Sequence, residues 1–380
     1  MNAALSLSSA PLAPLAPFGQ DAAADIFLRQ LDQDRLGHAW LLHGVKGIGK
    51  ALLAQALATV ALVHRPTQGS LAERLTQLAE DPLIPLIAQR ACPDLFWLER
   101  KSSDKPGQKA RLKAEIEVSQ VADRSNRSQT SLATFLTLSR AMAKRKVVII
   151  DAVEDLNRSA ANALLKDLEE PRPHTLFLLI SHRPGQLLPT LRSRTMAMPL
   201  APLGFDDFQR WLERAGRQPA PDASASTPEA RQEATLARAQ RLYAACAGRP
   251  GYALALEDLD LVGWQGKLAS ALDQLGNSDS PATPQEMASL LDPIIQTGDE
   301  QKRDWAMIIL LDSLAARARE HAALGWVEAH SQFTQAFRDL LALRLDARLT
   351  LSRVWLDLEA AAREKQRPIS SAAAPQDDHD

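Results

Sequence analysis

Apolar residues form two kinds of run in the first half of the chain. Three short runs, HAWLLHG (38–44), KVVIID (146–151) and TLFLLIS (175–181), are almost continuously apolar, which is typical of strands buried on both faces of a parallel sheet. Helical periodicity follows in ALLAQALATVAL (51–62) and in NRSAANALLKDLEEP (157–171), where apolar residues recur at i, i+3, i+4 and i+7. In the helix of residues 157–171, Asn157 or Ser159 could cap the start and Pro171 ends it. These repeated strand–helix units predict a doubly wound α/β domain with right-handed crossovers.

After Leu200 the chain shows helical patterns only. A stretch rich in proline, alanine and serine, residues 217–230, predicts a mobile loop between two helices. We therefore expect a flexible leader, an α/β domain, a small helical domain, a C-terminal all-helical domain and a disordered tail, at residues 1–19, 20–200, 201–256, 257–366 and 367–380.

Composition excludes several classes of protein. The formal net charge of the 380 residues is −2, so any contact with nucleic acid has to be local. No apolar run approaches the roughly 20 residues that span a bilayer, and the first residues have three prolines and no basic segment, unlike a signal peptide. The two cysteines, Cys92 and Cys246, lie far apart, which indicates a cytoplasmic protein with reduced thiols.

Residues 43–51, HGVKGIGKA, nearly form a phosphate-binding loop. Gly44, Gly49 and Lys50 fit the pattern G-x-x-x-x-G-K, but Ala51 stands where serine or threonine is needed. In a working loop the backbone N–H groups cradle phosphates, the lysine reaches the terminal phosphates and the hydroxyl binds Mg²⁺. The pattern therefore predicts a degenerate nucleotide site, in which binding of ATP or ADP is weak if it occurs.

Asp151 ends the second predicted strand, where an ATPase carries the aspartate that holds Mg²⁺. The next residue in such enzymes is often a glutamate that polarises water, and here it is Ala152, with Glu154 two residues further on. An aspartate after a strand also serves as an ordinary turn residue. Together with the glycine loop it indicates descent from a nucleotide site, but Ala51 and Ala152 speak against catalysis.

The segment LPTLRSRT (188–195) places Arg192 and Arg194 shortly after the third strand. Two interpretations remain open: a solvated basic turn, or an arginine finger whose planar guanidinium binds a neighbour's phosphates. Glu169 and Glu170 are expected to be surface residues at a helix end. The basic run 139–148 is expected to be a solvated helix end that can also meet a phosphate backbone.

Metal binding is not expected from this sequence. The eight histidines include no i, i+4 pair, and the two cysteines are isolated from each other. Both features speak against zinc, which structural sites bind with clustered cysteine and histidine ligands.

The stretch from residue 146 to residue 195 resembles the AAA+ subunits of the bacterial DNA polymerase III clamp loader, in particular those of the delta-prime type. LGHAWLLHGVKGIGK (36–50) and ACPDLFWLE (91–99) are similar to the same family, and the resemblance covers about residues 18–256. It implies an α/β AAA+ P-loop domain, a helical lid domain and a helical collar. It also implies membership of the DNA polymerase III holoenzyme and of a ring-like pentamer that loads a sliding clamp onto primed DNA.

The resemblance also implies roles for particular residues. The family's S-R-C motif is here Ser193–Arg194–Thr195, so Arg194 is expected to act in trans on the ATP of a neighbouring subunit. The four-cysteine zinc module of the family is missing, since only Cys92 lies in that region. The sensor arginine is missing too, because Gly251 and Tyr252 occupy its place. The implied subunit does not hydrolyse ATP; its partners are gamma/tau and delta subunits and, indirectly, the clamp and primer–template DNA.

Two other functions stay open from the sequence. An ATP-hydrolysing gamma/tau-type subunit of the same loader requires serine or threonine at position 51, and a stand-alone P-loop ATPase or kinase would turn over as a monomer. We also expect the helices of residues 257–365 to drive assembly, although an ordinary intramolecular bundle explains their apolar rows equally well. These rows are Trp305, Ile308, Ile309 and Leu311, and Leu340, Leu341, Leu343 and Leu345.

Overall fold

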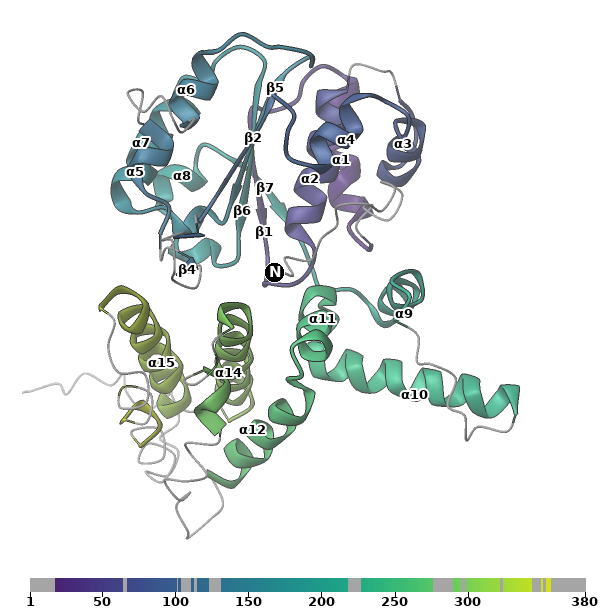
Figure 1. The fold of residues 1–380 in the computed structure, drawn as a ribbon, viewed down its shortest axis with the longest axis vertical. Coiled ribbons are helices and arrows are strands. Elements are labelled where there is room, and N and C mark those ends of the chain that lie inside the picture. Colours follow the sequence, from purple (N-terminus) through teal and green to yellow (C-terminus); the bar gives the residue numbers. More distant parts are fainter. Residues whose placement is uncertain are drawn as a thin grey trace, which may run out of the picture. The chain divides into compact units, whose positions relative to one another are not determined.

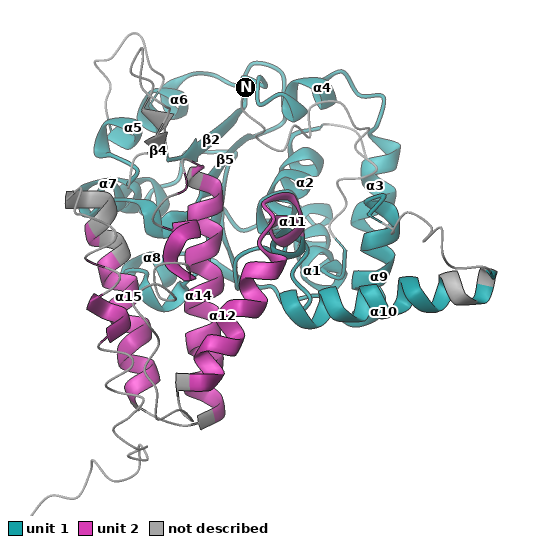
Figure 2. Ribbon diagram, turned by 60° about the horizontal axis from the view of Figure 1, so that its bottom comes forward, with its two compact units in different colours: residues 1–253 teal, residues 254–380 magenta. Residues whose placement is uncertain are grey.

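The chain forms two compact units, residues 1–253 and residues 254–380 (Figure 2). The structure is a computed structural model. It describes residues 18–63, 67–100, 102–103, 111–112, 115–122, 131–217, 227–275, 290–294, 297, 299–321, 324–343, 350 and 353–356. The expected leader, except for its last two residues, most of the loop 217–230 and the tail 367–380 therefore lie outside the described residues.

A five-stranded parallel sheet forms the centre of the first unit (Figure 1). The strands lie in the order β2-β5-β6-β1-β7, and every neighbouring pair is parallel. Three of them, β1, β5 and β6, are the strands that the sequence predicts, whereas the two edge strands β2 and β7 were not predicted. The bounds are β1 Ala39–His43, β2 Leu95–Glu99, β5 Lys146–Asp151, β6 Thr175–Ser181 and β7 Met196–Pro199, with a separate antiparallel pair β3 Ser102–Ser103 and β4 Arg111–Leu112.

Helices cover both faces of the sheet, as expected for a doubly wound domain (Figure 1). Side chains alternate along β1, so Trp40 and Leu42 pack into one core while Ala39 and Leu41 pack into the other. The first core is covered by α1 Asp21–Asp32, α2 Lys50–Leu62, α3 Leu71–Gln77 and α4 Leu83–Ala88. The second is covered by α5 Val118–Ala122, α6 Leu132–Thr137, α7 Arg158–Glu169 and α8 Pro189–Arg192.

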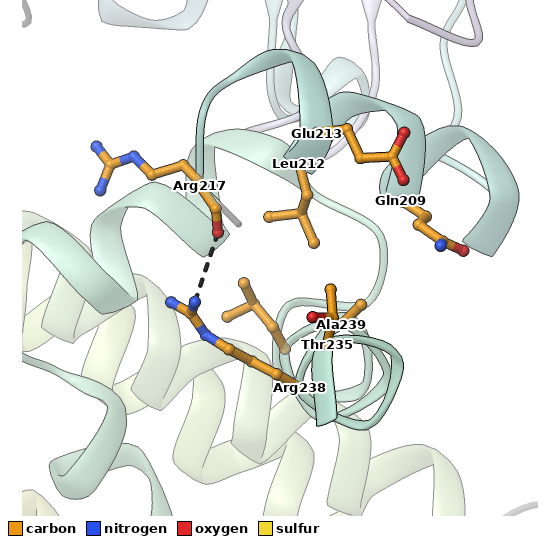
Figure 3. A pocket seen from close by; sticks show the side chains of 8 residues that line it. Gln209, Leu212, Glu213, Arg217, Thr235, Arg238 and Ala239 are labelled. Carbon is orange, nitrogen blue, oxygen red and sulfur yellow. Dashed lines mark hydrogen bonds between the residues drawn. The ribbon is translucent and has the colours of Figure 1, made fainter. Parts of the chain in front are cut away.

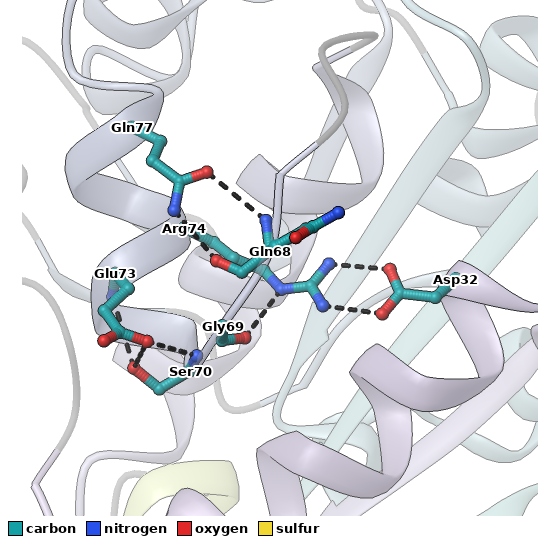
Figure 4. Close-up of polar contacts among 7 residues, drawn as sticks. All are labelled: Asp32, Gln68, Gly69, Ser70, Glu73, Arg74 and Gln77. Carbon is teal, nitrogen blue, oxygen red and sulfur yellow. Dashed lines mark hydrogen bonds and ion pairs between the residues drawn. The ribbon is translucent and has the colours of Figure 1, made fainter.

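Polar contacts fix the helix ends and the packing of α1 and α3. Asn157 caps α7 by accepting a hydrogen bond from the backbone N–H of Ala160 at 2.8 Å, which settles the choice between the two capping candidates. A capping box of Ser70 and Glu73 begins α3. The buried Arg74 guanidinium donates both terminal nitrogens to the Asp32 carboxylate at 2.7 and 2.6 Å, joining α3 to α1 (Figure 4).

The basic run 139–148 is solvated at Arg140 and Lys144, as the sequence suggests, but it is a loop leading into β5 and not a helix end. Helix α6 ends at Thr137, and a loop follows that the buried Asp94 carboxylate holds by accepting the backbone N–H groups of residues 141–143. Lys146 is buried as well and donates to the carbonyl oxygen of Phe135 at 2.6 Å. Buried charged side chains therefore hold the middle of the loop and its junction with β5.

The first unit continues into helices α9 Phe205–Arg214, α10 Pro228–Cys246 and the start of α11 Pro250–Asp258. Phe208 of α9 is buried and packs edge-on against Tyr243 of α10 at 5.4 Å between ring centroids. The cavity between these two helices, which Leu212 and Arg238 help to line, measures about 20 Å³ (Figure 3). That volume holds about one water molecule, so no small-molecule ligand fits there.

The second unit contains helices α12 Val262–Leu275, α14 Glu300–His321 and α15 Leu324–Leu343. Arg317 of α14 joins α12 through an ion pair with Asp273 and a 3.2 Å hydrogen bond to the carbonyl oxygen of Ala269. Ile309 and Leu311 are buried in this unit, whereas Trp305 and Ile308 are partly buried. The side chains of Leu340, Leu341, Leu343 and Leu345 lie outside the described residues, and the role of this unit in assembly stays a prediction. Among the helices that the structure describes, none is long and apolar enough to cross a membrane.

Candidate functional site

The glycine loop joins the carboxyl end of β1 to the first turn of α2, where a phosphate-binding loop is expected. Gly49 precedes α2 with φ +92°, a left-handed conformation that side chains other than glycine rarely adopt. A Cβ on Gly44 would lie 2.4 Å from the carbonyl oxygen of Leu200, so only glycine fits there. The loop thus keeps the backbone shape that its glycines predict.

Lys50 is bound to the loop from which it starts. Its side chain is buried, and Nζ donates to the carbonyl oxygens of Gly44 and Val45, each at 2.7 Å. Burial lowers the pKa of Lys50 to about 8, and the negative charges of Glu154 and Asp151 oppose that change. In this arrangement the lysine closes the loop on itself, and its ammonium group is engaged with carbonyl oxygens where phosphate oxygens would be needed.

Asp151 and Ala51 occupy the two positions at which an active site holds Mg²⁺. Ala51 lies in the first turn of α2 and carries no oxygen on its side chain. Asp151 ends β5 beside Glu99 of β2, its partner in the strand register. Burial, followed by the negative charge of Glu99, raises the pKa of Asp151 to about 6, while Lys46 and Lys50 oppose the shift. Of the two side-chain oxygen ligands that Mg²⁺ requires, only the Asp151 carboxylate is present, and its raised pKa disfavours its ionised form.

Glu154 and His182 meet at the same edge of the sheet. Glu154 lies in the short 3₁₀ turn Val153–Asp155, and its Oε1 accepts the backbone N–H of His182, just after β6, at 2.6 Å. The other Glu154 oxygen and His182 Nδ1 are buried and have no hydrogen-bond partner within the described chain. Burial, and then the charge of Lys50, holds the pKa of His182 far below its usual range. His182 was not among the candidates from the sequence, although its place directly after a buried parallel strand is a signal for this site.

The first turn of α11 lies directly against the glycine loop. The backbone N–H of Gly251 donates to the carbonyl oxygen of Gly47 at 2.7 Å. Arg249, close to the expected sensor position, is buried; its Nε donates to the carbonyl oxygen of Cys246 at 2.9 Å and its guanidinium lies over the Tyr252 ring. A backbone hydrogen bond between two glycines thus joins the helix to the loop, and Arg249 is engaged within the helical part of the unit.

These features together decide whether Mg²⁺-nucleotide fits. The lysine is engaged, the hydroxyl is absent, and α11 is hydrogen-bonded to the loop. The residues present therefore do not fit Mg²⁺-ATP held as in an active phosphate-binding loop. Nor does any group of three or more histidine, cysteine or acidic side chains in the described chain have an arrangement that suits a metal ion.

Arg194 lies near the amino-terminal ends of the parallel strands, whereas the glycine loop lies at their carboxyl ends. It precedes β7, and in the register Met196 pairs with Trp40 at the start of β1 while Pro199 pairs with His43 at its end. Arg194 donates through one terminal nitrogen to Glu169 at 2.7 Å and through the other to the carbonyl oxygen of Thr190 at 2.9 Å. Arg192, by contrast, is close enough to His43 for its charge to add to burial in lowering the pKa of that histidine.

Arg194 also lines an open hollow of about 340 Å³ on the surface. Its side chain is 33% exposed, and it shares the hollow with its neighbours in the 193–196 segment and with residues that lead into β1. The hollow is lined by Gly37, His38, Ala39, Ser193, Thr195 and Met196 in addition to Arg194.

Comparison with known proteins gives one consistent family. A family model described as "DNA polymerase III, delta subunit" matches residues 19–204. The DNA polymerase III subunit delta-prime of Pseudomonas aeruginosa is 38% identical over 178 residues, which are 47% of each chain. The Escherichia coli delta-prime subunit is 35% identical over 179 residues, 47% of this chain and 46% of its own.

A longer but weaker match extends towards the C-terminus. The Escherichia coli DNA polymerase III subunit tau is 26% identical over 308 residues, 80% of this chain and 41% of its own. The chain spans about half the length of the curated relatives that it matches. The Pseudomonas aeruginosa and Escherichia coli delta-prime subunits are 38% and 35% identical, compared with 26% for this tau subunit. Residues 19–204 therefore match the DNA polymerase III delta-type family model, and the chain is similar to subunits named delta-prime.

Proposed function

We propose that this protein is the delta-prime, or stator, subunit of a bacterial clamp loader with an AAA+ domain. It works in the cytoplasm during DNA replication, next to gamma/tau-type and delta-type subunits, and through them it acts on the sliding clamp and primed DNA. The similarity of residues 19–204 to subunits named delta-prime supports this role. In this proposal the helices that follow β7 correspond to the lid and the collar.

The observation that carries the proposal is the state of the glycine loop. An ATP-hydrolysing subunit needs a lysine free to reach phosphate and a hydroxyl on Mg²⁺. Here Lys50 bonds two carbonyl oxygens of its own loop, and residue 51 is alanine. A subunit that contributes structure and an arginine to the ring, without hydrolysing ATP itself, agrees with both facts.

Arg194 is the arginine that we assign to the neighbour's nucleotide. Met196 lies at the start of β7 and Pro199 at its end, three residue steps or about 10 Å further along the strand. The glycine loop follows the carboxyl end of β1, beyond the end of β7 that lies away from Arg194. The local loop is therefore a poor target for this side chain. A guanidinium is always charged and binds phosphate oxygens in pairs, so at an interface it stabilises the charge that develops during ATP hydrolysis.

The test is Arg194→Ala in the reconstituted loader, with the gamma/tau and delta subunits present. ATP hydrolysis stimulated by primed DNA should fall by about tenfold or more at the affected site, within the about 10³–10⁵ that such fingers supply. Arg192→Ala is the matched control, because it removes an exposed arginine from the same turn and should leave the rate unchanged. A wild-type rate of clamp loading with Arg194→Ala would refute the assignment.

A gamma/tau-type motor is the second candidate, favoured by the 308-residue match to tau. It predicts that the isolated chain hydrolyses ATP at about 1 s⁻¹ or faster, as does a stand-alone P-loop ATPase or kinase, and that Lys50→Ala abolishes this activity. Absence of turnover from the isolated chain, together with stable entry into the complex, would exclude both.

A further inference from the structure

The partner of Arg194 in this chain is Glu169, the last residue of α7. Glu169 Oε1 lies 2.7 Å from a terminal nitrogen of the guanidinium, and the two side chains are 47% and 33% exposed. The other terminal nitrogen donates to the carbonyl oxygen of Thr190 in α8. Two separate helices therefore hold one guanidinium, each through a different nitrogen.

The contacts within the chain leave part of the Arg194 guanidinium able to donate further hydrogen bonds. A guanidinium has five N–H donors. The nitrogen that meets Glu169 uses one of them, and the other terminal nitrogen donates to the carbonyl oxygen of Thr190 and, at 3.4 Å, to the Ser193 hydroxyl, so two donors remain. A flexible arginine loses rotamer freedom when it binds phosphate, and a carboxylate that already orders the side chain reduces that loss. The remaining donors are available to an anion from outside.

Arg194 lines the hollow, whereas Glu169, which binds Arg194, does not. Among the residues that line the hollow, Arg194 is the one with a permanent charge, and Glu169 is not among them. His38 also lines it, and its Nε2 lies 3.1 Å from the carbonyl oxygen of Leu168 in α7. An anion that enters the hollow meets the guanidinium, while the carboxylate that holds it does not form part of the wall.

We propose that Glu169 is a positioning residue for Arg194: it orders the guanidinium for a phosphate group that a neighbouring subunit brings to the hollow. The inference rests on the proposed function, because it assumes that Arg194 acts on a nucleotide in trans. Glu169 does not touch the nucleotide and acts only through the arginine. Its loss should therefore lower the rate of hydrolysis and leave the neighbour's affinity for ATP unchanged.

The experiment compares Glu169→Ala, Glu169→Gln and Glu170→Ala in the reconstituted loader. Glu169→Ala should reduce kcat for ATP hydrolysis on primed DNA about three- to tenfold, with KM for ATP unchanged. Glu169→Gln keeps an acceptor oxygen and should recover most of the rate. Glu170→Ala removes the same charge from the adjacent exposed position and should behave as wild type. A rate that rises in Glu169→Ala would mean that the carboxylate competes with phosphate, and would overturn the proposal.

Arg194→Ala and the double variant separate this inference from the proposed function. If Glu169 acts through Arg194, the double variant should be no slower than Arg194→Ala alone. An additive loss, or a wild-type rate in Glu169→Ala while Arg194→Ala is slow, would overturn the positioning role and leave the finger intact. A wild-type rate in Arg194→Ala would overturn the finger and the positioning role together.

A measurement on the isolated full-length chain covers the case in which a variant fails to assemble. The NMR order parameter of Arg194 Nε reports how firmly the guanidinium is held. It should fall in Glu169→Ala and stay unchanged in Glu170→Ala. An unchanged order parameter in Glu169→Ala would show that Glu169 does not order the arginine, and would refute the proposal.

Discussion

Replacing Asp151 with asparagine should stabilise the first unit at neutral pH. The pKa of this carboxyl group is raised from 3.8 to about 6, first by burial and then by the charge of Glu99. Because the folded-state pKa exceeds the unfolded one, the ionised carboxylate disfavours folding above about pH 6. That penalty is lost as pH falls from about 6 towards 4, where the group becomes protonated in both states.

The size of the effect follows from the shift. About two pKa units at 1.36 kcal/mol each give at most about 3 kcal/mol. The carboxylate is only partly buried, and asparagine forgoes the attraction of Lys46 and Lys50 that opposes the shift. We therefore expect Asp151→Asn to raise the free energy of unfolding by about 1–2 kcal/mol at about pH 7.5.

Urea unfolding followed by tryptophan fluorescence measures this gain, with the buried Trp40 as a reporter of the sheet. The difference between variant and wild type at each pH cancels the titration of all other groups. Asp25→Asn, at an exposed position of α1, is the control and should change stability by less than about 0.5 kcal/mol. A gain that persists unchanged at about pH 4, or a loss of stability at neutral pH, would refute the electrostatic reasoning.

Four further outcomes are expected. Ala51→Ser alone should give no ATP hydrolysis in a phosphate-release assay, because Lys50 stays bound to its own loop; turnover of about 1 s⁻¹ would contradict this. Arg74→Lys should cost about 1–3 kcal/mol in thermal unfolding, since lysine cannot make the paired bond to Asp32; an unchanged midpoint would contradict it. Chelation of divalent metals should leave the unfolding midpoint where it is, and a drop would indicate a structural zinc. A chain that ends at residue 257 should fail to enter the complex in gel filtration, and co-elution would refute the assembly role of the second unit.

The fold could be predicted from sequence where burial is two-sided. β1, β5 and β6 lie inside the sheet, so both of their faces need apolar side chains and their runs are continuous. The edge strands β2 and β7 have one neighbour each and several partly exposed or exposed positions, and β7 ends in proline, which edges tolerate. Their patterns therefore resemble those of loops.

The candidate site could be predicted only in part. Gly44, Gly49, Lys50 and Asp151 lie at one edge of the sheet, as the motif spacing predicts. The contacts that decide chemistry depend on tertiary geometry: the lysine turned into its loop and the bond from Gly251 to the loop. The sequence places Glu169 at a helix end and Arg194 in a basic turn or an arginine finger, but it carries no signal that the two side chains pair.

The contact between Gly251 and Gly47 ties the position of α11 to that of the glycine loop. A Cβ at residue 251 would lie 3.1 Å from both the Cα and the carbonyl oxygen of Gly47, so the helix and the loop would have to move apart by a few tenths of an ångström to admit alanine. The backbone hydrogen bond from Gly251 to Gly47 would lengthen by a similar amount, so a substitution far along the chain from the loop would loosen the loop itself.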